Sequence, residues 1–363
     1  MKLHSLHDNR ELVMQLLDHW DYDADGLDLL DRFRISANAV YPFKCREKLR
    51  FLRFAPVSEK RPGQSEAELA FLAWLDRQGY CAGQPVPSRS DRLLEICETQ
   101  WGRYQASVFE GVAGVRLDGS ELTDNRITAY GQSLARLHEL SSRYEPLPRN
   151  RPWNWKQVLE WSVKTLEEIP VLPVGAYGPG FDDIPASEYE TGPEAAQDEA
   201  ERLASLFAAF PESPDSLGVI HYDFETDNVF WQQDSNRCVP IDFDDAMVFW
   251  YIADIAQALD SLKETIADKA EASKADSLET WQQAACGCFL AGYRSIRPIS
   301  DEMLAFIPAF LRFTALYGYA RIVRSLSEVH PDEPEWMADL RKKLHQLMRE
   351  RRAVFGNPLV QKP

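Results

Sequence analysis

The chain has 363 residues, of which 45% are hydrophobic and 27% are charged, and it carries a formal net charge of −17. This balance is typical of a folded protein and is too apolar for intrinsic disorder. So acidic a chain is a poor partner for nucleic acid, whose phosphates require a surplus of Lys and Arg, and its length favours two domains or lobes over one core.

Other features bear on the compartment. No apolar run approaches the roughly 20 residues that span a bilayer, and the first 18 residues mix charges with leucines, unlike a signal peptide. The six cysteines have no zinc-site spacing and are typical of reduced thiols in a chain of this length. We therefore expect a cytoplasmic protein that binds neither nucleic acid nor membrane. The sequence leaves the oligomeric state open.

The first 110 residues have an α+β pattern. Leucines at helical spacing predict two helices, at residues 10–19 and 66–78. Runs of β-prone residues predict four strands, at residues 39–45, 49–55, 93–98 and 104–109. The short turn between the first two strands indicates an antiparallel hairpin.

Beyond residues 111–114 the pattern becomes mostly helical. Helical spacing predicts further helices at residues 124–141, 153–168, 194–210, 252–266, 278–295, 301–329 (as one helix or two) and 335–354. We therefore predict a small β-rich N-terminal lobe, residues 1–110, and a larger helical C-terminal lobe, residues 111–363. The first lobe holds 15 basic and 17 acidic residues and the second 25 and 40, so nearly all the excess charge lies in the second.

One segment of the second lobe carries polar residues suited to chemistry. Short β-prone runs flank the turn residues 234–236 and predict a hairpin centred on Ser235. Asn228 and Asp242 each lie seven residues from that centre, so the hairpin places them side by side, and Asp223 precedes Asn228 by five residues. An amide oxygen and a carboxylate are hard ligands that suit Mg²⁺. A further carboxylate can accept a proton from a hydroxyl, as in phosphoryl transfer from ATP.

The same segment resembles a known family. His221-x-Asp223-x4-Asn228, followed by Ile-Asp-Phe-Asp at 241–244, is similar to the catalytic and metal loops of the aminoglycoside phosphotransferase and choline kinase group. This resemblance implies a bilobal protein-kinase-like fold.

The resemblance also implies roles for individual residues. Asp223 would be the catalytic base, and Asn228 and Asp242 would hold Mg²⁺. His221 and Asp254 would support the loop structurally. For two neighbouring carboxylates, Asp244 and Asp245, lining the site and a direct metal role are the alternatives.

In the first lobe the resemblance concerns an ion pair. Residues 66–75 are similar to the small-lobe helix whose Glu pairs with the nucleotide-binding basic residue, which implies this role for Glu68. A capping box formed by Ser65 and Glu68 is the alternative. The basic residue falls on Arg53, where the family usually has Lys, with Arg50 and Lys48 as alternative registers. The fork of Arg can hold phosphate oxygens, but Arg and Lys are not interchangeable.

The remaining nucleotide contacts are assigned by position. The chain has no G-x-G-x-x-G loop, and residues 35–40 occupy the place of the phosphate-covering loop, so that Ser36 and Asn38 are candidates. An ordinary polar turn is the alternative. Glu110 and Val112 would form the hinge that meets the adenine.

Two further features of the second lobe have competing interpretations. Residues 182–201 hold eight acids and no basic residue, which indicates a solvated surface or a collar for a cationic acceptor. Trp153, Trp155 and Trp161 are interpreted as packing residues rather than as a stacking platform.

These observations predict an ATP- and Mg²⁺-dependent phosphotransferase whose acceptor is a hydroxyl of a small cationic or polar molecule: an aminoglycoside, an amino alcohol, homoserine or a sugar. The alternatives are a non-catalytic pseudokinase, which Arg53 and the Gly-poor loop favour, and a Ser/Thr protein kinase. The short stretch from Asp242 to Asp254 leaves little room for the activation loop of the latter. The sequence does not distinguish ATP from GTP.

Overall fold

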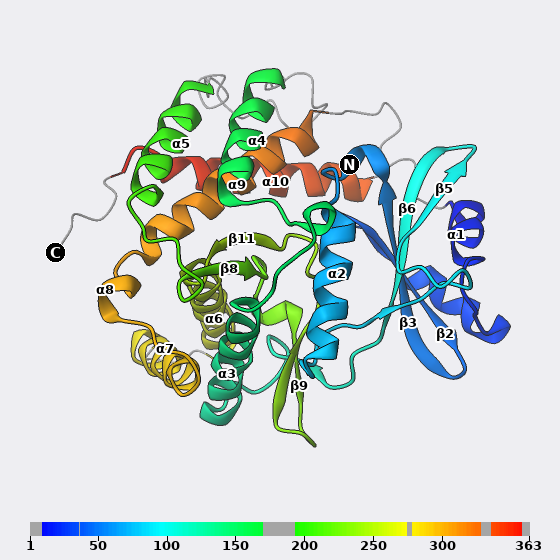
Figure 1. Ribbon diagram of the computed structural model, residues 1–363, viewed down its shortest axis with the longest axis horizontal. Helices are drawn as coiled ribbons and strands as arrows, with labels where there is room; N and C mark the ends of the chain where they lie inside the picture. Colours follow the sequence, from blue (N-terminus) through cyan, green and yellow to red (C-terminus); the bar gives the residue numbers. More distant parts are fainter. Residues whose placement is uncertain (1–8, 36, 170–192, 274–277, 328–334, 358–363) are drawn as a thin grey trace. The chain divides into compact units, whose positions relative to one another are not determined.

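The computed structural model describes residues 9–35, 37–169, 193–273, 278–327 and 335–357 (Figure 1). The chain divides into two compact units. The first unit takes residues 3–152 and 214–299, and the second takes residues 153–213 and 300–363. The boundary predicted near residues 110–114 stays a prediction.

The first unit opens with an antiparallel sheet. Its strands are β1 (Arg34–Ile35), β2 (Ala39–Cys45), β3 (Lys48–Pro56), β4 (Pro85–Val86), β5 (Glu95–Thr99) and β6 (Gly102–Glu110). The spatial order is β1-β2-β3-β6, and both β4 and β5 pair with β6. The predicted hairpin is confirmed: Cys45 pairs with Lys48, and Arg46 and Glu47 between them have positive φ angles of 52° and 63°. Two positive φ angles are typical of the tight turns that match the twist of paired strands.

The two faces of β3 have different partners because side chains alternate along a strand. Leu52 and Phe54 join a buried core with α1 (Arg10–Leu17) on one face of the sheet. Arg53, between them, points to the other face and meets Glu68 of α2 (Gln64–Arg77). Strand alternation thus places the buried Arg53 against α2, the helix that carries Glu68.

Shorter strands and helices complete the first unit. The strands are β7 (Val115–Arg116), β8 (Leu217–Ile220), β9 (Val229–Gln232), β10 (Arg237–Pro240) and β11 (Met247–Trp250), in sheets β10-β9-β7 and β11-β8. The longer helices are α3 (Asp124–Ser141), α6 (Ile252–Ser273) and α7 (Leu278–Arg294). The short 3-10 helices are η2 (Ala24–Arg32), η3 (Val57–Glu59), η4 (Pro148–Asn150) and η7 (Thr226–Asn228).

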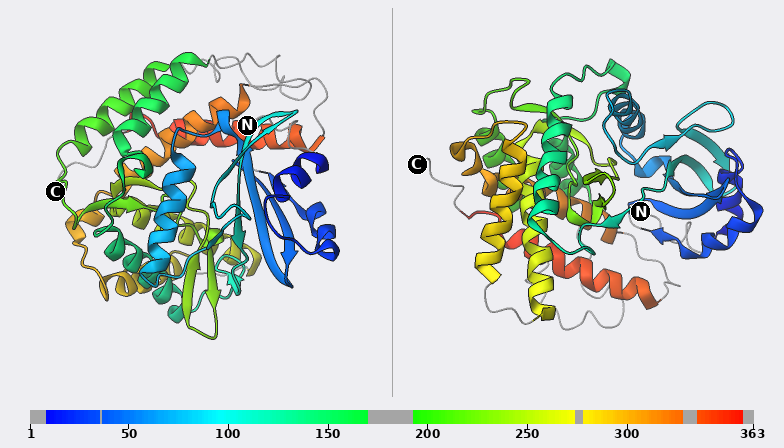
Figure 2. Two further views of the ribbon diagram at one scale, coloured as in Figure 1. Left: turned by 45° about the vertical axis from the view of Figure 1, so that its right-hand side comes forward. Right: turned by 90° about the horizontal axis from the view of Figure 1, so that it is seen from below.

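Helices α3 and α7 run side by side (Figure 2). Glycines make this close approach possible: a Cβ on Gly131 would lie 2.1 Å from the Phe289 carbonyl oxygen, and one on Gly292 would lie 2.1 Å from the Thr128 carbonyl oxygen. Both distances are too short for any side chain, so the backbones themselves are in contact.

The second unit is helical. Its helices are α4 (Trp155–Glu168), α5 (Pro193–Phe207), α8 (Asp301–Leu304), α9 (Ile307–Leu326) and α10 (Glu335–Ala353). Helix α9 packs against α4, α5 and α10. A buried ion pair joins two of them, with Arg312 Nε 2.8 Å from Glu199 Oε1. Trp155 and Trp161 pack edge-on against Phe207 and Tyr317.

The stretch Asp301–Leu326 differs from the expectation that no apolar run approaches membrane-spanning length. By length and composition alone this stretch could cross a membrane, and half of its most apolar 18-residue window is buried inside the fold. A helix at the centre of a folded unit is also apolar, because its side chains face neighbouring helices. Helix α9 packs against three such helices and fits this description.

The predicted elements are mostly confirmed. The helix predicted at residues 252–266 continues to Ser273, and the one at 301–329 is two helices, α8 and α9. All six cysteines are free thiols. The α+β class, with an N-terminal antiparallel sheet and a helical C-terminal part, is confirmed.

Candidate active site

The predicted hairpin forms, but one residue out of register. Strands β9 and β10 pair Val229 with Pro240, and the N–H of Ile241 donates to the carbonyl of Asn228 at 2.9 Å. Asn228 therefore lies opposite Ile241 and not opposite Asp242, because the connecting turn has an even number of residues and no residue at its centre. Asp242 follows with a φ of 62°, a left-handed backbone conformation that ends the strand.

Asn228 is bonded directly to Asp223. Its Nδ2 donates to the Asp223 carboxylate oxygen Oδ2 at 2.7 Å and to the Asp223 carbonyl at 3.1 Å. Because two acceptors surround this nitrogen, the amide is oriented with its oxygen on the other side. The η7 turn thus holds a carboxylate and presents an amide oxygen next to it.

Arg53 connects the antiparallel sheet and α2 to this site. One amino group of its guanidinium binds Glu68, and the other, Nη1, lies 3.2 Å from Asp242 Oδ1. The guanidinium carbon also lies 4.5 Å from the centre of the Phe109 ring, a cation–π distance. Burial raises the pKa of Glu68, and the charge of Arg53 opposes that rise.

This geometry bears on the alternatives for both residues. The N-cap of α2 is Gly63, so Ser65 lies inside the helix and does not form the capping box. Of the three basic candidates on β3, the structure brings Arg53 to Glu68; Lys48 is exposed at the start of the strand.

Asp254, at the start of α6, supports the backbone of the loop that carries Asp223. It is fully buried and accepts the N–H of His221 at 2.8 Å and that of Tyr222 at 2.7 Å. Tyr222 has a positive φ of 64°. A carboxylate that binds consecutive N–H groups holds this strained turn just before Asp223.

A third donor to Asp254 is His138 of α3, whose Nε2 lies 3.0 Å away. Its Nδ1 lies 2.9 Å from the hydroxyl of Tyr293, which can donate to this nitrogen when the ring is neutral. Burial lowers the pKa of His138. The sequence analysis missed His138, whose place on the buried face of a predicted helix signals burial but not a partner on another helix.

The ring of His221 bonds to backbone groups on either side of the site. Its Nε2 lies 2.9 Å from the carbonyl of Ile241, and its Nδ1 accepts the N–H of Asp223 at 3.2 Å. The first nitrogen must therefore carry the proton and the second the lone pair. Burial lowers the pKa of His221, which keeps it neutral.

The carboxylates after Asp242 are paired with cations near α2. Asp244 Oδ2 lies 2.5 Å from Lys60 Nζ, and Asp245 Oδ1 lies 3.8 Å from Arg61 Nη2. Together with the Arg53–Asp242 pair, three cations of the first 61 residues meet three carboxylates of one turn. The sequence analysis missed Lys60 and Arg61, because a basic residue in a polar loop carries no signal of its partner.

The remaining predicted nucleotide contacts are placed as follows. Asn38 is buried, and its Nδ2 donates to Asp244 Oδ2 at 3.2 Å. Glu110 ends β6 with its N–H bonded to the carbonyl of Gln84 at 2.8 Å, and Val112 is half-buried just beyond it. Ser36 lies outside the described residues. A role in nucleotide binding stays a prediction for each of them.

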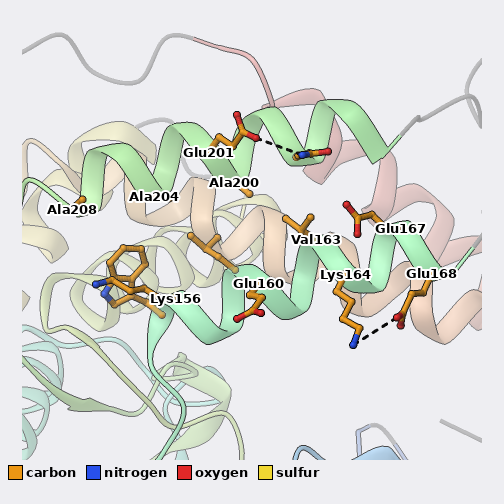
Figure 3. Close-up of a pocket in the computed structure, with 13 residues that line it drawn as sticks. Lys156, Glu160, Val163, Lys164, Glu167, Glu168, Ala200, Glu201, Ala204 and Ala208 are labelled. Carbon is orange, nitrogen blue, oxygen red and sulfur yellow. Dashed lines mark hydrogen bonds and ion pairs between the residues drawn. The ribbon is translucent and has the colours of Figure 1, made fainter.

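A groove of about 780 Å³ lies between α4 and α5 of the second unit (Figure 3). Trp155 and two alanines of α5 line it, and so do side chains of both charges, among them Lys156, Lys164, Glu160 and Glu201. Lys164 is paired with Glu168 on the same helix. It contains none of the residues predicted for catalysis or for nucleotide binding.

The acidic run predicted at residues 182–201 is only partly described, since residues 182–192 lie outside the described ranges. Within the described part, Glu199 is fully buried against Arg312 and so belongs to neither a solvated surface nor a collar.

Comparison with known proteins places this chain in a family. A model of the phosphotransferase enzyme family matches residues 38–299. Homoserine kinase from Methylorubrum populi is 29% identical over 257 residues, covering 69% of this chain and 68% of that protein. Homoserine kinase from Methylobacterium radiotolerans is 27% identical over 299 residues, covering 80% of this chain and 79% of that protein. A solved amicoumacin kinase in complex with AMP-PNP and Ca²⁺ superimposes with a TM-score of 0.71 at 17% identity, over 100% of this chain and 98% of that one.

Proposed function

We propose that this chain, which belongs to the phosphotransferase enzyme family, transfers the γ-phosphoryl group of ATP with the help of Mg²⁺. It is a small-molecule phosphotransferase with an alcohol group as acceptor. The observation that carries the proposal is the cluster of Asp223, Asn228 and Asp242, joined to Glu68 through Arg53. These are the residue types that phosphoryl transfer requires: a carboxylate for the hydroxyl, hard oxygen ligands for the metal and a cation for the phosphates.

The donor set fits Mg²⁺. Asn228 directs its amide oxygen away from Asp223, and the Asp242 side chain is 45% exposed, with one ion pair through Oδ1. An amide oxygen and one carboxylate, with phosphate oxygens and water, match the few protein ligands that Mg²⁺ takes. When bound, the metal neutralises charge on the phosphates.

The chain's own residues do the rest. Asp223, held by Asn228, orients the acceptor hydroxyl and takes its proton. Arg53 binds phosphate oxygens from its place between Glu68 and Asp242. His221 is not a base, because its lone pair at Nδ1 is used by the N–H of Asp223; it keeps the loop in place.

The acceptor that the comparisons favour is a small amino alcohol. The two curated relatives named above are homoserine kinases, and each is matched over more than two thirds of its length. Homoserine carries an ammonium group and a carboxylate and has no net charge, so the choice rests on these relatives and not on the charge of the chain. Six free thiols support a reducing, cytoplasmic location.

The test is Mg²⁺-dependent ADP formation from ATP across a panel of homoserine, other amino alcohols, aminoglycosides and sugars. We expect turnover with at least one amino alcohol. The matched control is Asp223→Asn, which should abolish turnover and still bind AMP-PNP, because the amide keeps the shape and loses the basic oxygen. Nucleotide binding without turnover on any acceptor would identify a pseudokinase, and wild-type turnover by Asp223→Asn would remove Asp223 from the mechanism.

A further inference from the structure

The turn that carries Asp242 is held by side chains that the proposed reaction does not use. Asp244, two residues further on, is only 6% exposed. Its Oδ2 accepts from Lys60 Nζ at 2.5 Å and from Asn38 Nδ2 at 3.2 Å, and its backbone carbonyl accepts from Gln64 Nε2 at 2.6 Å. Three segments therefore bond to this one residue: the turn before β2, the loop before α2 and the first turn of α2.

The Lys60–Asp244 pair is unusually buried for two charges. The side chains are 7% and 8% exposed. Removing two charges from water offsets much of their attraction, so such a pair adds little net stability, and its best-attested use is to specify one arrangement of the chain.

The arrangement specified here is that of residues 242–245. Asp242 is 45% exposed and has a left-handed φ of 62°, so neither packing nor regular structure holds its side chain in place. The bonds to the buried Asp244 fix the backbone of this turn two residues after Asp242. The position of the exposed carboxylate therefore depends on the buried one as well as on the ion pair with Arg53.

We propose that Lys60 is a positioning residue for the metal ligand: acting through Asp244, it holds the 242–245 turn so that Asp242 meets Mg²⁺. Lys60 contacts Asp244 and is not itself assigned to metal or nucleotide. Asn38 supports the same carboxylate, which gives it a role in the site other than the phosphate contact predicted from its position. The inference rests on the proposed function, because it takes Asp242 as the ligand.

The test compares AMP-PNP binding with and without Mg²⁺ by isothermal titration calorimetry, so that no acceptor is required. In Lys60→Met we expect the factor by which Mg²⁺ tightens binding to fall about fivefold or more. Metal-free binding should stay within about twofold of wild type. Asp244→Asn should have the same effect, and the double variant should be no worse than the more severe single one, because both act through one bond.

Two further variants sharpen the comparison. Lys48→Met removes an exposed cation at the start of β3 and should change neither measurement. Lys60→Arg should restore part of the Mg²⁺ effect, because it keeps a cation for Asp244. If Lys60→Met does not fold, as judged by circular dichroism, Asp244→Asn decides alone, because its amide keeps the shape of the side chain.

Several results would overturn the inference. One is an unchanged Mg²⁺ effect in folded Lys60→Met, and another is an additive double variant. Loss of metal-free binding by about tenfold or more would make Lys60 a direct nucleotide ligand instead. A wild-type protein on which Mg²⁺ has no effect contradicts the metal role of Asp242 and the inference with it. A normal Mg²⁺ effect without transfer to any acceptor contradicts the proposed function alone.

Discussion

Arg53 of β3 and Asp242 of the turn after β10 form an ion pair, with 3.2 Å between Nη1 and Oδ1, although 189 positions separate them in the chain. The same guanidinium binds Glu68 of α2 and lies over the Phe109 ring. One planar cation therefore connects a strand, a helix and the proposed metal turn.

Replacing Arg53 with Lys tests the need for that planar fork. A single ammonium on a flexible stem cannot serve Glu68 and Asp242 with two fixed amino groups. We expect Arg53→Lys to lower kcat/KM for ATP about tenfold or more, equivalent to about 1.4 kcal/mol. Steady-state kinetics measure this. Arg103→Lys is the matched control, because Arg103 is exposed on β6 and pairs with Glu98; equal effects of the two substitutions would contradict the prediction.

Replacing Asp254 with Asn tests the support of the catalytic loop. Asp254 accepts three hydrogen bonds in the buried interior, and an amide would turn an N–H₂ group toward at least one of the three donors. We expect the free energy of unfolding to fall by about 3 kcal/mol or more, with loss of transfer activity. Urea denaturation measures the change. Asp268→Asn, at an exposed position of the same helix, should have little effect; similar losses in both variants would argue against the network.

Acid should destabilise the first unit through its buried histidines. Burial lowers the pKa of His138 and of His221 below the value of about 6.5 that holds in the unfolded chain. The unfolded chain therefore binds more protons, so the stabilisation is fully present above about pH 6.5 and is lost as the pH falls toward the folded pKa values. Each histidine contributes a slope of up to about 1.4 kcal/mol per pH unit.

The measurement is urea denaturation at two pH values on either side of that window. In His138→Gln the amide can still donate to Asp254 and accept from Tyr293, but it does not titrate. We expect this variant to lose less stability on acidification than wild type does. An identical pH dependence would show that His138 is not one of the responsible groups.

Two glycines on one helix test the close packing of α3 and α7. Gly292→Ala should lower the free energy of unfolding by about 1–3 kcal/mol, because its Cβ would lie 2.1 Å from the backbone oxygen of Thr128. Gly287→Ala on the same helix meets nothing within 4 Å. It should raise stability by up to about 1 kcal/mol through helix propensity. Thermal or urea unfolding measures both, and the same sign for the two variants would contradict this account.

Much of this protein could be predicted from its sequence, because the information is local. Alternation along β2 and β3 and the period of α3 reflect contacts between residues a few positions apart. The candidate catalytic segment could be proposed from the sequence for a similar reason: Asp223, Asn228 and Asp242 lie within 20 positions of one another. The β9–β10 hairpin brings the turn of Asn228 next to the turn of Asp242, one residue out of the predicted register.

The partners of these residues were decided by tertiary structure. From the sequence, Glu68 could also have capped its own helix. In the structure the N-cap of α2 is Gly63, and Arg53 lies against Glu68. His138 reaches Asp254 across 116 positions of chain, and Lys60 reaches Asp244 across 184. A buried polar group must find a partner wherever packing puts one, and which distant segment supplies it depends on the arrangement of the whole unit. Residue identity therefore specified the chemistry that the site offers, and packing specified which residues hold it in place.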